Sequence, residues 1–291
     1  MSMFKNRIES FRFRYIPGLA QRLIDASTWI ANRKLSKIGR IGILVDNNII
    51  GNATTHETAW ISTGPKLWGD EVIDTGYAAR IPSHPGDSDA REYRNIQYLP
   101  GLISLFRRNH VHLYTSAELQ DEQFRHPVGR YRGYGMYDLN LFADLALDSI
   151  DGLTFPYIGP SWMNLSDIST QQADRLKAYA QRDPEYASLV KILGPKNSQD
   201  AWHIRTAEIH NLFCFLTMDF KLIKALNAQK GTDRIKGLKT RVLTPIELGK
   251  ELGLFPINPL ILSYTNASFP VRADLSWENG KPRGGRRKKS D

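Results

Sequence analysis

Cysteine is almost absent from the sequence: Cys214 is the only one in 291 residues. A single thiol excludes an intramolecular disulfide and any zinc site built from several thiolates, which fits a reducing compartment. Long apolar runs are also missing, since no stretch approaches the roughly 18 residues that cross a bilayer, and the first residues are charged where a signal peptide is apolar. We therefore expect a soluble, cytoplasmic protein that does not enter a membrane.

Two motifs of common enzyme classes are missing as well. The chain has no glycine-rich phosphate loop followed by Lys and Ser or Thr, and no serine in a nucleophile elbow. These absences count against an NTPase and against a serine hydrolase. The remaining composition, 41% hydrophobic and 24% charged, is typical of a globular protein.

Positive charge is concentrated at the two ends of the chain. Residues 1–40 hold nine basic and two acidic residues, and residues 279–291 hold six basic and one acidic residue. Since the whole chain carries +9, residues 41–278 carry a net charge of −3. Such a distribution suits a protein that meets a polyanion at its periphery. The alternative is that the basic ends only keep the protein dissolved.

Four short apolar runs have the composition of buried parallel strands: 41–45, 111–114, 212–216 and 241–243. The first run continues into Ile49 and Ile50, and helical patterns separate the four runs. This alternation predicts an α/β protein with a central, mainly parallel sheet.

The rest of the chain is organised around these strands. An amphipathic pattern after Pro17 and Gly18 predicts a basic helical extension over residues 1–40, packed on the body of the protein. Residues 41–255 form the main unit, with an insertion at about 123–170 that fits the strand and helix rhythm poorly. Residues 256–278 are a C-terminal extension, and residues 279–291 are a basic tail that we expect to be disordered.

Carboxylates follow two of the predicted strands. Asp46 comes directly after the first strand and Asp219 after the third, while Asp200 opens the preceding helix, which Ser198 can cap. Parallel strands present their carboxyl ends at one edge of a sheet, so these three carboxylates can converge there. The alternative is that each aspartate is an ordinary helix cap or strand-end residue.

A cluster of carboxylates is costly without a cation. Two unit charges about 5 Å apart repel by roughly 3 kcal/mol at an effective dielectric constant near 20. A divalent cation removes this cost, and oxygen ligands select Mg²⁺ or Mn²⁺ over zinc.

Four segments together resemble the PIN domain family of metal-dependent nucleases. They are the strand that ends in Asp46 with Asn48 two residues later, the helix Ser198–Ala207, the strand that ends Thr217-Met218-Asp219, and Val242–Pro245. The resemblance implies a three-layer α/β/α sandwich whose active site uses three or four acids to bind metal and to hydrolyse phosphodiester bonds with activated water.

The same resemblance implies a fourth acid about six residues after Ser116, at the end of the second strand. Glu122 has this spacing, and Glu118, one helical turn earlier, is the alternative. The implied catalytic residues and metal ligands are Asp46, Glu122, Asp200 and Asp219.

Three polar residues are expected to support these acids. The resemblance implies that Asn48 and Thr217 hold Asp46 and Asp219 in place, and the alternative for Thr217 is an ordinary strand-end residue. His203 lies one turn after Asp200 on the same helix face, where it either borders the site or is an ordinary buried histidine. Arg205 replaces a small residue of the family pattern, and the helical spacing predicts that it faces solvent.

An aromatic and basic stretch is the expected substrate contact. Arg130, Tyr131, Arg132 and Tyr134 can stack on bases and neutralise phosphates of single-stranded RNA. The alternative is a plain surface loop.

The function expected from these observations is hydrolysis of phosphodiester bonds, with RNA favoured over DNA as substrate. A non-catalytic PIN-like module that binds RNA or protein stays open, as do a DNA-directed flap-type nuclease and a homodimer. Retention of all four acids favours the enzyme, because a binding module gains nothing from their repulsion.

Deleting residues 279–291 should weaken binding to nucleic acid without slowing the chemical step. Six basic residues that neutralise phosphates on a single strand change the slope of log K against log salt by up to about 4. Titrations at several salt concentrations measure this slope, and kcat at saturating substrate should stay near the full-length value. An unchanged slope would show that the tail does not touch nucleic acid.

Overall fold

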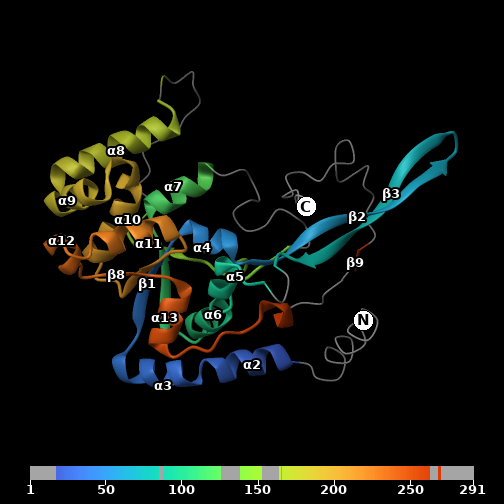
Figure 1. Ribbon diagram of the computed structural model, residues 1–291, viewed down its shortest axis with the longest axis horizontal. Coiled ribbons are helices and arrows are strands. Elements are labelled where there is room, and N and C mark those ends of the chain that lie inside the picture. The colour runs from blue at the N-terminus through green and yellow to red at the C-terminus, as the bar shows by residue number, and fades with distance from the viewer. Residues whose placement is uncertain are drawn as a thin grey trace.

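The computed structural model describes residues 18–84, 88–125, 138–152, 164, 166–262 and 268–269. At its centre lies a five-stranded sheet in the order β6-β4-β1-β7-β8, in which all neighbouring strands run parallel (Figure 1). Its strands are β1 (Ile41–Val45), β4 (Val111–Thr115), β6 (Asp148–Ser149), β7 (Cys214–Leu216) and β8 (Arg241–Leu243). The prediction of an α/β protein with a parallel central sheet is confirmed.

Helices cover both faces of this sheet because β1 is apolar on both sides. Ile43 and Val45 belong to a core shared with α3, α6 and α13, whereas Leu44 belongs to a second core shared with α8, α9, α10 and α11. This arrangement is compatible with the expected three layers. The covering helices are α3 (Trp29–Ile38), α6 (Leu99–Arg107), α13 (Pro245–Leu252), α8 (Ile168–Arg182), α9 (Pro184–Leu193), α10 (Ser198–Ile209) and α11 (Phe220–Ala228).

The described part of the N-terminal extension, residues 18–40, forms two helices where the sequence predicts one. α2 (Leu19–Ser27) ends at Thr28, whose hydroxyl donates to the carbonyl of Asp25 at 3.0 Å, and α3 begins at the next residue. α2 packs against α6 and α3 packs against α13, with Ile24 and Leu35 buried. None of the helices in the described part of the chain combines the length and apolar character that a bilayer crossing requires.

The expected continuation of the first strand into Ile49 and Ile50 is wrong. These residues lie in a short helix, α4 (Asn47–Asn52), because the Asp46 side chain accepts the backbone N–H of Asn48 and starts the helix there. Ile49 and Ile50 are fully buried, so their apolar character serves packing of a helix and not of a strand.

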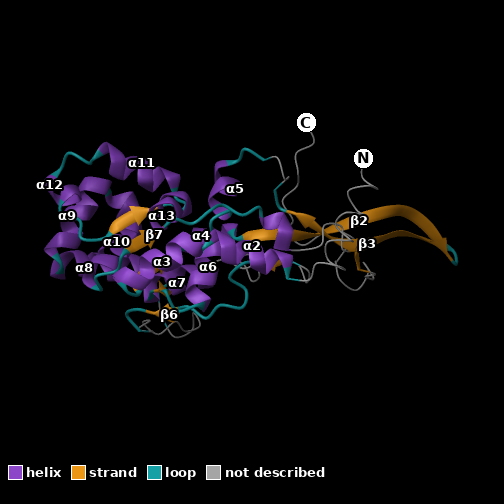
Figure 2. Cartoon of the chain, turned by 90° about the horizontal axis from the view of Figure 1, so that it is seen from below, coloured by secondary structure: helices purple, strands orange, loops and turns teal. Residues whose placement is uncertain are grey.

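A long hairpin follows α4, and the sequence analysis did not predict it. β2 (Thr54–Trp68) and β3 (Glu71–Pro82) pair antiparallel and project from the body as a two-stranded ribbon (Figures 1 and 2). Gly69 in the turn has a φ of 65°, which glycine adopts without strain. At its base the hairpin pairs with β5 (Leu139–Asn140) and β9 (Ser268–Phe269), which completes a second sheet.

The remaining described elements connect these parts. The predicted insertion at 123–170 includes the end of α7, the strands β5 and β6 and the start of α8, while residues 126–137 and 153–163 lie outside the described residues. The basic tail 279–291 lies outside them too. The connecting elements are α5 (Arg91–Ile96), α7 (Ala117–Arg125), α12 (Asp233–Lys236) and two short 3₁₀ segments, Pro195–Asn197 and Pro259–Leu262.

Replacing Gly249 with Ala should destabilise the protein, although alanine ordinarily favours a helix. A Cβ atom at this position of α13 would overlap the ring of Tyr98. Overpacking costs about 1 to 3 kcal/mol, which exceeds the gain of up to about 1 kcal/mol in helix propensity. The matched control is Gly51→Ala in α4, where a Cβ meets nothing within 4 Å and stability should rise. Urea unfolding of both variants measures the two signs, and equal effects would contradict the packing argument.

Candidate acidic site

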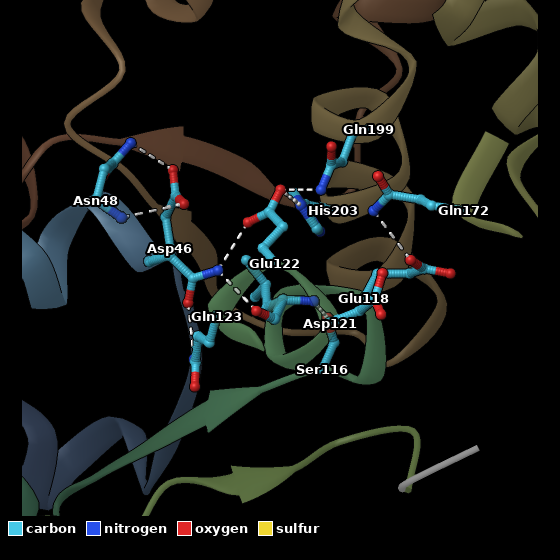
Figure 3. Close-up of polar contacts among 12 residues, drawn as sticks. Asp46, Asn48, Ser116, Glu118, Asp121, Glu122, Gln123, Gln172, Gln199 and His203 are labelled. Atoms are coloured by element: carbon cyan, nitrogen blue, oxygen red, sulfur yellow. Dashed lines mark hydrogen bonds and ion pairs between the residues drawn. The ribbon is translucent and has the colours of Figure 1, made fainter. Parts of the chain in front are cut away.

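The four acids predicted from the sequence come from four elements around one edge of the parallel sheet. Asp46 follows β1 and Asp219 follows β7, so both leave the sheet at its carboxyl edge. Glu122 lies on α7, which follows the neighbouring strand β4, and Asp200 lies in the first turn of α10. Figure 3 shows Asp46 in contact with Asn48 and, beside this pair, Glu122 directed toward Gln199 and His203.

Asp46 is buried and held by two side chains. Its Oδ2 accepts hydrogen bonds from Asn48 Nδ2 and from the Thr217 hydroxyl, each at 2.6 Å, and the side chain keeps only 8% of its exposure. Asn48 Nδ2 also donates to the Thr217 hydroxyl oxygen at 3.1 Å. Both supporting residues suggested by the sequence therefore contact the Asp46 carboxylate directly.

Asp219 is held differently. Its Oδ1 accepts the backbone N–H groups of Lys221 at 2.8 Å and of Leu222 at 3.0 Å, so the carboxylate caps α11. Thr217 contacts the backbone of Asp219 and not its carboxylate: the Thr217 hydroxyl oxygen accepts the Asp219 N–H at 2.9 Å. Thr217 thus fixes the path of the chain at Asp219 and the side chain of Asp46.

Glu122 is oriented by amides that the sequence analysis missed. Asn47 Nδ2 donates to Glu122 Oε2 at 2.7 Å, and Gln199 Nε2 donates to Oε1. Asn47 is itself fixed, since it donates to the carbonyl of Leu119 at 2.7 Å and accepts from Gln123 at 2.8 Å. The only sequence signal for Asn47 and Gln199 is that each stands next to a predicted acid.

Glu118, the alternative fourth acid, belongs to a different network. Both of its carboxylate oxygens accept hydrogen bonds from Arg175 on α8, at 2.6 and 2.8 Å, and Gln172 adds a third at 3.2 Å. Arg175 also donates to the buried Asp121 at 2.9 Å. Figure 3 shows Glu118 turned toward Gln172, while Glu122 reaches toward Gln199 and His203.

Burial and neighbouring acids raise the pKa of two of the four site carboxylates. Burial raises the pKa of Asp46 to about 6, and this rise is reinforced by Glu122 and Asp200 although the Thr217 hydrogen bond and His203 oppose it. Burial likewise raises the pKa of Asp200 to about 6, with His203 opposing the rise and Asp219 and Glu122 adding to it. Asp46 and Asp200 are therefore each close enough to other acids of the site to interact with their charges.

His203 supplies the positive charge within this group of acids. Burial alone would lower its pKa, but the hydrogen bond to Glu122 at 3.4 Å and the charges of Glu122, Asp46 and Asp200 raise the pKa to about 8. Nδ1 of His203, in a side chain that is almost fully buried, has no hydrogen-bond partner among the described residues. The imidazole therefore carries a charge near neutral pH and offsets part of the acid repulsion.

The donor set fits a hard divalent cation in its chemistry. The carboxylate oxygens of the four acids are the ligands that Mg²⁺ and Mn²⁺ prefer, and the Asp200 carboxylate has no hydrogen-bond partner among the described residues. However, no group of three or more His, Cys, Asp and Glu side chains in the described ranges is already gathered to hold a metal ion. Binding a cation therefore requires the carboxylates to draw closer together.

Two local expectations on α10 are wrong. Ser198 does not cap this helix, because Asn197 occupies the cap position without a side-chain hydrogen bond. Arg205 does not face solvent freely: its Nε donates to Asp183 at 2.7 Å and its Nη1 lies 3.4 Å from Glu208. The predicted substrate contacts Arg130, Tyr131, Arg132 and Tyr134 lie outside the described residues.

Comparison with known proteins found no relative: no protein-family model, no curated protein and no solved structure matches this chain. The functional argument therefore rests on the side chains and their geometry.

Asp46→Asn should change how stability depends on pH when metal is removed. Between pH values of about 4 and 6 the unfolded chain loses the Asp46 proton while the folded chain keeps it, because the folded pKa is about 6 and the ordinary pKa is 3.8. Raising the pH through this window therefore destabilises the wild type. From pH 4 to 7 the variant should gain on the order of 2 kcal/mol relative to the wild type.

Urea unfolding in EDTA at several pH values measures this difference. The matched control is Asp174→Asn, an exposed carboxylate on α8, for which the difference from the wild type should stay flat across the same window. A flat difference for Asp46→Asn as well would show that this carboxylate is not destabilised in the folded protein.

Proposed function

We propose that the protein is a divalent-metal-dependent nuclease that hydrolyses phosphodiester bonds, with single-stranded RNA as its preferred substrate. One observation carries the proposal: four acids from separate parts of the chain lie around one edge of the parallel sheet, and burial together with neighbouring acids raises the pKa of Asp46 and of Asp200 to about 6. Buried carboxylates that repel one another cost stability in the absence of a ligand. A bound divalent cation would remove this repulsion, so the cluster is best explained as a cation site.

The side chains divide into ligands and supports. Asp46, Glu122, Asp200 and Asp219 would hold Mg²⁺ or Mn²⁺, which supplies a water of lowered pKa and stabilises the leaving oxygen of the phosphodiester. Asn48 and Thr217 orient Asp46, and Asn47 orients Glu122. His203 lowers the repulsion among the acids, which lets the cluster fold before the cation arrives.

The PIN-like assignment is part of the same proposal. It is supported by a parallel sheet with helices on both faces and by acids placed after β1 and β7, as the resemblance implies. Supporting side chains from the same motifs contact these acids, because Asn48 and Thr217 both donate to Asp46.

A PIN-like module that binds without cutting is the second candidate. One observation favours it: amides and an imidazole already satisfy Glu122, and the described residues hold no ready-made metal group. A module of this kind would bind RNA or a protein through the same face and would not need Mn²⁺ for it.

Glu122→Gln should abolish cleavage while leaving the fold intact. The substitution keeps the shape and the hydrogen bond from Asn47 but removes one charged ligand, so the rate should fall at least about a hundredfold, as for other groups that act on the transition state. The assay incubates labelled single-stranded RNA, single-stranded DNA and a DNA flap with the full chain in Mn²⁺, Mg²⁺ or EDTA.

Two controls make this assay decisive. Asp174→Asn removes an exposed carboxylate of α8 and should cut at the wild-type rate. Thermal melts with and without Mn²⁺ show whether the cation binds at all, independently of cutting. Cleavage that persists in EDTA, or in Glu122→Gln, would refute the proposal, and RNA binding without any cleavage would favour the second candidate. Faster cutting of the flap than of RNA would correct the substrate.

A further inference from the structure

Large apolar side chains that face solvent gather in two places. Ten are exposed in the described part of the chain, and four of these lie at the end of the hairpin: Leu67, Trp68, Val72 and Ile73. Four more lie on the two N-terminal helices: Leu23, Trp29, Ile30 and Ile38. Clustered apolar groups on a surface mark interaction sites. We call these places the hairpin tip (residues 62–76) and the α2–α3 surface (residues 19–40).

The hairpin tip is apolar on both faces and has little support. Leu67 is paired with Val72 on one face, whereas Trp68 and Ile73 lie on the other, and Trp68 is 78% exposed. β5 and β9 pair only with the base of the hairpin, so residues 62–76 pair with no third strand among the described residues. Two strands alone are marginally stable in water, which indicates that another surface covers the tip.

The α2–α3 surface combines aromatic and basic groups. Trp29, Arg33 and Lys37 follow one another at helical spacing, all are exposed, and the Arg33 guanidinium lies 5.1 Å from the centre of the Trp29 ring. Residues 19–40 contain five basic residues and one acidic residue, a net charge of +4. The acidic residue, Asp25, is paired with Arg108, so the outward charge is positive.

The hairpin tip has the opposite charge. Its only basic residue is Lys66, against Asp70, Glu71 and Asp74, which gives a net charge of −2. Nucleic acid does not suit this tip, because phosphates carry the same sign. A basic surface with an exposed aromatic ring suits it in both charge and apolar character. The α2–α3 surface has these properties, but the hairpin projects away from α2 and α3 of its own chain (Figure 1).

We propose that the hairpin tip docks on the α2–α3 surface of a second copy of this chain, and that the hairpin tip of the second copy docks on the α2–α3 surface of the first. A twofold dimer makes every contact between two different residues twice, so two dissimilar surfaces form a closed pair. β2 has 15 residues, and at about 3.3 Å per residue it is roughly 50 Å long, enough to reach past the body (Figure 2). Trp68 and Trp29 are the central apolar contacts, and Glu71 faces Lys37.

Sedimentation of the full chain tests this dimer without relying on any catalytic activity. The wild type should sediment as a dimer at micromolar concentration, and Trp68→Ala or Trp29→Ala should each weaken the dimer at least about tenfold, as expected for a central aromatic contact. The matched control is Ile209→Ala, which removes an exposed apolar side chain that lies outside both surfaces. This variant should leave the dimer unchanged. Circular dichroism melts verify that each variant is folded.

Mixing the two tryptophan variants separates this dimer from other pairings. A pair made of one Trp68→Ala chain and one Trp29→Ala chain keeps one unaltered contact, so the mixture should associate more tightly than either variant alone. Glu71→Lys and Lys37→Glu should each weaken the dimer, and the double variant should recover it. Three results would overturn the proposal: a wild type that is monomeric, a dimer that persists in both tryptophan variants, or a mixture that associates no more tightly than either variant alone. The last result is the one expected if the dimer pairs tip to tip.

Discussion

Parallel pairing of β1 with β4 on one side and β7 on the other determines both the core and the position of the acids. The register places Val45 beside Leu216, and the backbone N–H of Asp46 donates to the Leu216 carbonyl at 3.0 Å. The strands therefore end at the same level, and Thr217 reaches the Asp46 carboxylate as a direct result. A one-residue shift of the register would move the side chains of β1 from one core into the other, where they do not fit the neighbouring helices, and would separate the acids at the same time.

Helix α7 shows two ways of burying an acid. On one side, Glu118 and Asp121 share Arg175, and the hydrogen bond to Glu118 holds the pKa of that guanidinium well above its usual range, so a permanent positive charge offsets part of their negative charge. On the other side, Glu122 accepts hydrogen bonds from the amides of Asn47 and Gln199, and His203 Nε2 lies 3.4 Å from its Oε1. The charge of Arg175 does not depend on pH, whereas the charge of His203 is lost as the pH rises past its pKa of about 8.

Local sequence determined what could be predicted and what could not. Continuous apolar runs gave the four predicted strands, and Asp46 and Asp219 could be placed at one edge because parallel strands end there. The prediction for Ile49 and Ile50 was wrong because a β-branched apolar pair favours a strand. The hydrogen bond to the Asp46 side chain starts a helix there instead. The hairpin could not be predicted because its small and polar residues form no apolar run. The roles of Asn47 and Gln199 could not be predicted because an uncharged amide has no sequence pattern that links it to an acid.

The contact between Thr217 and Asp46 also has a consequence for the order in which the molecule assembles. It joins residues 171 positions apart, and the pairing of β1 with β7 closes the same loop. Contacts so distant along the chain slow folding, because the entropy of closing the loop is lost before the contact stabilises anything. During synthesis, β1 can therefore acquire its second neighbour only after residues 41–217 have left the ribosome, and Asp46 and Asp219 come together no earlier than that.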